Sequence, residues 1–167
     1  FKPDMIDDLL TLAGEAVRHA RKLGTDAVHA VAADGRSTEI EILDGQIEKV
    51  EQAEALDISL KVYAGKSSAT ISGSVLTTDA IHRLAEKALA MARLAPPDPY
   101  AGIADADQLA KDIPDLDLAA DDMPNAEGLE RLAREAEAAA LAVPGVSKSS
   151  GAGASASDRI VAIVMSN

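Results

Sequence analysis

Apolar residues recur every three or four positions near the start of the chain, from Ile6 to Leu23. This spacing places them on one face of a helix that packs against a core. Asp4 is a suitable N-cap residue for that helix, and Gly24 is suited to end it. The chain is therefore expected to open with an amphipathic helix over 4–23.

The pattern then changes to alternation of apolar and polar residues, which is typical of strands with one solvated face. Three dipeptides that favour tight turns fall within this region: Asp34-Gly35, Asp44-Gly45 and Ala64-Gly65. Around these turns lie five strand-like segments, which cover 26–32, 38–42, 46–54, 58–63 and 69–73. The pattern predicts four or five antiparallel strands.

Helical spacing returns in two later segments. One begins near Thr78 and stops before the prolines that open 96–124, a long acidic segment with five prolines that is predicted to be a linker. The other starts after an Asn125 cap and ends at Pro144-Gly145. Six of its residues are predicted to face inward: Leu129, Leu132, Ala133, Ala136, Ala140 and Val143.

The final segment, Ile160–Met165, is apolar at every position. Such a run is expected of a central strand or of a strand buried against another domain, and both alternatives stay open. Before it, Gly151–Ala154 is predicted to be a flexible turn. The predicted fold is α+β: an antiparallel β-sheet with helices packed on one face, in the order helix, four to five strands, two helices, returning strand.

Charge and composition narrow the function. The chain has 16 basic and 28 acidic residues, a net charge of −12, so it repels phosphates and direct nucleic-acid binding is not expected. It has no cysteine, which excludes disulfides and thiolate metal sites and favours a reducing cytoplasm. No apolar run approaches the roughly 18 residues of a membrane span. Because the chain starts at Phe1 and stops directly after an apolar run, we expect it to be a piece of a larger protein.

The motifs that most often carry chemistry are incomplete. Gly65-Lys66-Ser67 lacks the earlier glycine of a phosphate-binding loop, and it is predicted to be a hairpin turn with a solvated lysine. His19, His29 and His82 have no zinc-site spacing and are expected at a surface or an interface.

The carboxylates are predicted to form a solvated surface, with a divalent-cation site or an acid–base pair as the alternative. Glu39 and Glu41 share one face of a strand, and Asp121 and Asp122 are adjacent in the linker. The sequence assigns no catalytic, cofactor-binding or metal-ligating residue.

Several blocks, in order and together covering most of the chain, resemble the TldD/PmbA family. Ser37–Glu48 resembles its strand, Asp-Gly turn and Glu element, and Ile58–Lys66 matches the hairpin that follows. Ala90–Asp105 and Glu137–Val146 resemble signatures of the PmbA (TldE) branch. The stretch from Gly151 to Asn167 fits the approach to a Ser-Asn-Gly junction. Residues 1–167 thus look like the N-terminal domain of such a protein, truncated before its C-terminal domain.

The resemblance implies one subunit of a two-subunit cytoplasmic metallopeptidase. In that family the TldD subunit holds the metal, expected to be zinc, through a His-Glu-x-x-x-His motif in its C-terminal domain, and PmbA is its partner. The complex is thought to trim unfolded peptides, including microcin leaders and an antitoxin. The resemblance therefore implies a TldD-like partner, an unfolded peptide substrate and no cofactor in these residues, with a homo-oligomer as the expectation for the subunit alone.

Two other classes of function stay open. Family members are often described as modulators of DNA gyrase, and the segment 96–141 carries 12 acidic and three basic residues. An acidic protein-binding module acting on gyrase or another partner is the first alternative. An independent hydrolase that uses unpaired carboxylates is the second.

Overall fold

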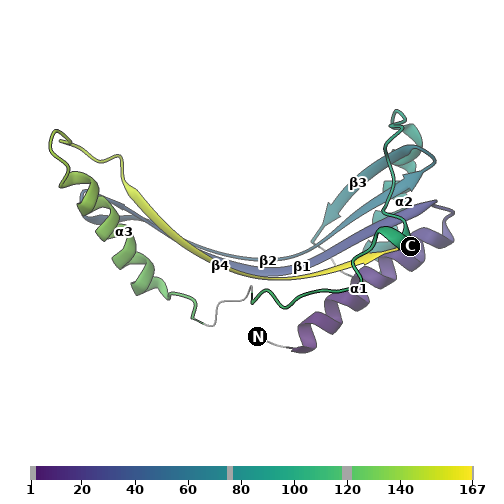
Figure 1. Cartoon of the computed structure of the whole chain (residues 1–167), viewed down its shortest axis with the longest axis horizontal. Coiled ribbons are helices and arrows are strands. Elements are labelled where there is room, and N and C mark those ends of the chain that lie inside the picture. The colour runs from purple at the N-terminus through teal and green to yellow at the C-terminus, as the bar shows by residue number, and fades with distance from the viewer. Residues whose placement is uncertain (1–2, 75–76, 118–121, 167) are drawn as a thin grey trace. The chain divides into compact units, whose positions relative to one another are not determined.

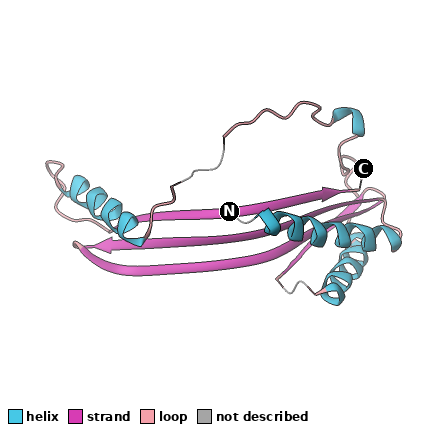
Figure 2. Ribbon diagram, turned by 90° about the horizontal axis from the view of Figure 1, so that it is seen from below, coloured by secondary structure: helices cyan, strands magenta, loops and turns pink. Residues whose placement is uncertain are grey.

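The structure is a computed structural model that describes residues 3–74, 77–117 and 122–166. Its elements follow the order α1 (Pro3–Lys22), β1 (Ala27–Leu43), β2 (Gln46–Ala64), β3 (Ser67–Gly73), α2 (Thr78–Leu94), the 3₁₀ helix η1 (Ala106–Gln108), α3 (Ala126–Leu141) and β4 (Ala152–Met165), as Figure 1 shows. The strands form one sheet in the order β3-β2-β1-β4 (Figure 2). The predicted α+β class and the order of elements are confirmed.

Three strands, rather than four or five, separate the first two helices, because β1 and β2 are each continuous. The hairpin turn predicted at Asp34-Gly35 is wrong, since β1 runs through both residues. A Cβ on Gly35 would lie 3.3 Å from both the Asp158 carbonyl oxygen and Arg159 Cγ. The glycine therefore gives β4 room to pass close to β1, and it does not reverse the chain.

The other two predicted turns are confirmed. Asp44 and Gly45 have φ angles of 50° and 68°, the doubly positive pair that suits a two-residue hairpin loop. Gly65 has a φ of 60° and joins β2 to β3. β3 pairs antiparallel with the second part of β2, from Ile58 opposite Gly73 to Ala64 opposite Ser67.

The contacts of the chain divide it into two compact units. Unit 1 comprises Phe1–Asp34, Ala55–Pro114 and Ile160–Asn167, and it contains α1, α2 and β3 with the adjoining parts of the other strands. The helices pack on the strand face that carries Val28, Leu60 and Ala162. Alanines line much of this core, so the helices approach the sheet closely without aromatic side chains.

Unit 2 comprises Gly35–Glu54 and Asp115–Arg159. Here α3 lies beside the end of the β1–β2 hairpin (Figure 1), and its buried side chains pack on β1. The core is small, with four buried residues, Ile40, Ile42, Leu129 and Ala133. Ala154 and Ala156 of β4 pack against it.

The observed ends and buried faces of the helices differ in part from those predicted from the sequence. α1 begins at Pro3, so Asp4 lies in its first turn and is not the N-cap. In α3 the Asn125 cap is confirmed, because its side chain accepts a hydrogen bond from the Gly128 amide. Four of the six residues predicted to face inward are instead exposed: Leu132 at 47%, Val143 at 52%, Ala136 and Ala140. The buried stripe of the helix is Leu129, Ala133 and Glu137, a narrower face than its alanines suggested.

The returning strand, β4, differs from its prediction in where it begins and in its place in the sheet. β4 begins at Ala152, so the flexible turn predicted over Gly151–Ala154 is wrong, and the small residues there pack under α3. Within the described residues β4 lies at one end of the sheet order, and not at its centre as one of the two alternatives predicted. Ala162 is buried, while Val161 and Ile163 on the other face are 47% and 54% exposed.

Candidate functional site

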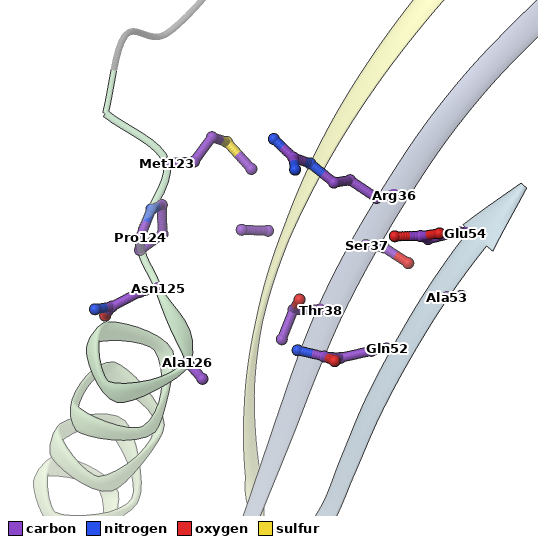
Figure 3. Close-up of a pocket in the computed structure, with 11 residues that line it drawn as sticks. Arg36, Ser37, Thr38, Gln52, Ala53, Glu54, Met123, Pro124, Asn125 and Ala126 are labelled. Atoms are coloured by element: carbon purple, nitrogen blue, oxygen red, sulfur yellow. The ribbon is translucent and has the colours of Figure 1, made fainter.

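A pocket of about 490 Å³ lies in unit 2, where the sheet extends past the start of α3. Its floor consists of β1 and β2 residues together with Ala156, and its wall is the segment Met123–Ala126. Figure 3 shows the Met123 and Arg36 side chains extending toward each other at one end, with Thr38 and Gln52 facing the helix terminus.

The chemistry of this pocket is polar and mixed in sign. Arg36 lies 3.4 Å from a carboxylate oxygen of Asp158, and Glu54 lines the pocket on the neighbouring strand. The Asn125 side-chain oxygen accepts a hydrogen bond from the Gly128 amide at 2.9 Å, so this backbone donor is already satisfied by the helix cap. The pocket is therefore a polar recess that favours neither a cation nor an anion.

Unit 2 also contains a buried carboxylate. Glu137 of α3 is only 3% exposed, and its two oxygens accept hydrogen bonds from the backbone amides of Asp44 at 3.1 Å and Gly45 at 2.8 Å. These donors stabilise the charged form. The Gly45 amide, with help from the Ser149 hydroxyl, the Asp44 amide and the charge of Arg134, lowers the pKa of Glu137 although its burial opposes the shift.

Arg134 completes this attachment of the hairpin turn to α3. Its guanidinium donates to the carbonyl oxygen of Gly45 and forms an ion pair with Glu130 at 2.7 Å. Apolar periodicity does not predict the burial of Glu137, because that pattern counts only apolar residues. Its position four residues after Ala133, on the stripe that faces the Asp44-Gly45 turn, is the signal that could have found it.

Glu39 and Glu41 belong to a surface network centred on Lys49. The Lys49 ammonium lies 2.9 Å from Glu51, 3.6 Å from Glu41 and 4.0 Å from Glu39. The Glu51 carboxylate, followed by Glu41 and Glu39, raises the pKa of Lys49. The predicted charged surface is thus a set of ion pairs.

The structure also bears on the cation alternative. Asp121 lies outside the described residues. Within 3–74, 77–117 and 122–166, no three His, Cys, Asp or Glu side chains are grouped so that they could hold a metal ion.

Two of the three histidines meet between α1 and α2 in unit 1. The rings of His19 and His82 stack with centroids 3.6 Å apart and planes 9° from parallel. His82 Nε2 lies 2.9 Å from Glu15, which also pairs with Arg18 at 2.7 Å. The hydrogen bond with His82, followed by that with Arg18, lowers the pKa of Glu15 to about 2. His29 stands apart from them on β1, half-buried.

The turn between β2 and β3 is held against the segment that follows α2. The Lys66 ammonium, predicted to be solvated, donates to the carbonyl oxygen of Ala101 at 3.3 Å, and the Lys66 carbonyl accepts from the Asp98 amide at 2.8 Å. Gly65-Lys66 is thus a hairpin turn with a structural role. None of the helices in the described part of the chain is both long and apolar enough to cross a bilayer.

These features define an antiparallel α+β domain whose polar recess and buried carboxylate lie in unit 2. Residues 30–92 match the family model for PmbA/TldA metallopeptidase domain 1. The chain is 38% identical over 129 residues to the Metalloprotease PmbA homolog of Haemophilus influenzae, which covers 75% of this chain and 28% of that protein. It is 41% identical over 99 residues to Metalloprotease PmbA of Escherichia coli O157:H7, covering 58% of this chain and 22% of that protein.

Solved structures share the fold. One is a Bacteroides thetaiotaomicron protein described as a modulator of DNA gyrase, with a TM-score of 0.70 and 20% identity over 93% of this chain and 36% of that chain. Another is TldE of Thermococcus kodakarensis, with a TM-score of 0.68 and 14% identity over 93% of this chain and 35% of that one. The chain belongs to the PmbA/TldD family and corresponds to its domain 1. It spans about a quarter of the length of the curated relatives it matches.

Proposed function

We propose that the chain is the non-catalytic N-terminal domain of a PmbA/TldE-type subunit. That subunit would assemble with a TldD-like subunit into a cytoplasmic metallopeptidase that trims unfolded peptides. The observation that carries the proposal is the 38% identity, over 129 residues, to a protein named as a metalloprotease PmbA homolog. The match to domain 1 of the metallopeptidase family supports the same assignment.

The proposal divides the chemistry between two chains. The TldD-like subunit would hold the metal, expected to be zinc, and residues 1–167 would take no part in the catalytic step. The described residues do not group into a metal-binding set, so they are given a different task. That task is to bind and position the peptide or the partner subunit, for which a sheet with exposed edges is suited.

The test is a peptidase assay on an unfolded peptide, with the full-length subunit alone, with its TldD-like partner, and with a chelator. Cleavage is expected only in the mixture, in the size-exclusion fraction that contains both subunits, and the chelator should abolish it. Cleavage by the subunit alone would contradict the proposal, because its own C-terminal region would then carry the metal.

A second candidate is an acidic module that binds gyrase or another protein. It is favoured by the acidic stretch 96–141 and by the fold shared with a protein described as a modulator of DNA gyrase. Retention of purified gyrase on the immobilised full-length subunit, with no cleavage in any mixture, would favour this module. Cleavage that needs the partner, with no retention of gyrase, would exclude it.

A further inference from the structure

One side of β2 has no neighbouring strand along much of its length. β3 pairs only with Ile58–Ala64 of β2. In the described part of the chain the sheet order ends at β3 on this side, so the preceding residues of β2 lie at the edge of the sheet. Within unit 2 this free edge is the segment 46–54, and every residue in it is exposed.

An edge of this length presents a row of backbone donors and acceptors to a further strand. In an extended strand the N–H and C=O groups alternate between the two sides, so about half of those in 46–54 point away from β1. Two apolar side chains stand on the same segment, Ile47 at 46% exposed and Val50 at 55%. An added strand would cover apolar surface as well as satisfy backbone groups.

The charge around the edge is strongly negative. Residues 35–54 contain six acidic and two basic side chains. Both basic groups are engaged, Arg36 with Asp158 and Lys49 with a set of three glutamates. Glu48 and Glu54 have no ion-pair partner among the described residues.

We propose that the edge 46–54 binds an extended peptide segment rich in lysine or arginine by strand addition. The backbone ladder supplies affinity without reading sequence, and the carboxylates select a basic strand. A second copy of this chain is a poor occupant, because pairing the edge with itself would set Glu48 and Glu54 among carboxylates of the same sign. A folded partner without a free edge offers no backbone groups to pair.

Binding at this edge would make extended peptides rich in lysine or arginine the substrate class of the proposed peptidase subunit. This inference therefore rests on the proposed function. The binding itself requires neither cleavage nor a partner subunit, so the two can fail separately. Binding at the edge without any peptidase activity in the full assembly would leave this inference standing and remove the proposed function. Partner-dependent cleavage without binding at the edge would leave the proposed function standing and remove this inference.

The experiment is an NMR titration of the full-length subunit, segmentally labelled over residues 1–167, with three peptides of about nine residues, the length opposite 46–54. The first alternates lysine with valine. The second replaces each lysine with glutamate, and the third keeps lysine but carries N-methyl groups on alternate amides at the edge-facing positions. Only the first peptide is expected to bind, with shifts concentrated in the amides of 46–54 and with affinity that falls as salt rises.

Two double variants show whether the charge of this edge matters. Glu48→Gln with Glu54→Gln should weaken binding of the lysine peptide roughly three- to tenfold. The matched control, Glu86→Gln with Glu127→Gln, removes the same charge from α2 and α3 and should leave the affinity unchanged.

Four results would overturn the inference. The first is binding of the lysine and glutamate peptides with equal affinity, and the second is undiminished binding of the N-methylated peptide. The third is a set of shifts that lies outside 46–54, and the fourth is no shift at millimolar peptide. Shifts in 46–54 that depend on protein concentration alone would instead make a second copy the occupant.

Discussion

At the scale of single residues, Glu137 attaches α3 to the hairpin turn of unit 2. It places one buried carboxylate between two backbone amides of the Asp44-Gly45 turn. Both turn residues have positive φ, a conformation that costs an L-residue such as Asp44 some stability. The charge-assisted hydrogen bonds that the Asp44 and Gly45 amides donate to Glu137 offset that cost and fix the turn to α3.

Replacing this carboxylate tests the attachment directly. Glu137→Gln keeps the shape but removes the charge and one acceptor oxygen, so one turn amide loses its partner. We expect the unfolding midpoint to fall by about 2–8 °C. Hydrogen exchange of the Asp44 and Gly45 amides should accelerate in the same variant.

The control is Glu135→Gln, which removes a carboxylate that is 66% exposed on the same helix and should change neither quantity. If Glu137→Gln left the exchange of both turn amides unchanged, the carboxylate would not be holding the turn.

At the scale of elements, α1 and α2 are joined by packing and by one polar group. Glu15 accepts from His82 across the two helices, and the hydrogen bonds hold its pKa at about 2 against an ordinary 4.5. A carboxyl with a lowered folded pKa stabilises the fold above its unfolded pKa. That stabilisation is lost as the pH falls from 4.5 towards 2, because the unfolded state binds the proton first.

The pH dependence of Glu15→Gln should therefore differ from that of the parent chain. Urea unfolding between pH 5 and 2 should show a shallower loss of stability in the variant, because one group that takes up a proton on unfolding is gone. Glu86→Gln on α2 serves as the control and should keep the parent slope. Equal slopes for Glu15→Gln and the parent would contradict the contact between the helices.

Local sequence signals predicted most helices, strands and turns, but they did not predict that a strand continues through a turn-like dipeptide. Helix spacing, the Asn125 cap and the Asp44-Gly45 turn can be read along the chain, and each is confirmed. Asp34-Gly35 carries the same turn signal and yet lies inside β1. What differs is the close passage of β4 beside Gly35, a contact between residues more than a hundred positions apart in the sequence. Propensity cannot contain that information.

At the scale of the whole chain, the two compact units have cores of different size. Unit 1 buries side chains from two helices and three strands, including the large side chains of Leu9, Ile58 and Leu60. Unit 2 depends on four buried residues from α3 and β1. Since stability follows buried apolar area, unit 2 is expected to open more readily, and its amides to exchange faster.

Leu129→Ala should affect unit 2 selectively. Truncating this fully buried leucine is expected to cost roughly 2–5 kcal/mol, which accelerates exchange in α3 and in 38–43 at least about 30-fold. Leu132→Ala makes the same change three residues away at a 47% exposed position and should have little effect. An equal effect of Leu129→Ala on the amides of α1 would show that the units unfold together.

The sequence by itself determined the class of fold, the order of the elements and the family, because periodicity, caps, turns and short blocks of family-like sequence are local properties of the chain. Tertiary structure decided which predicted strand segments form one continuous strand and which side of α3 is buried. It also decided which strand lies at each edge of the described sheet. Those outcomes depend on contacts between distant segments, such as Glu137 with the Asp44-Gly45 turn and β4 with Gly35. A pattern read along one segment holds no record of the segment that packs against it.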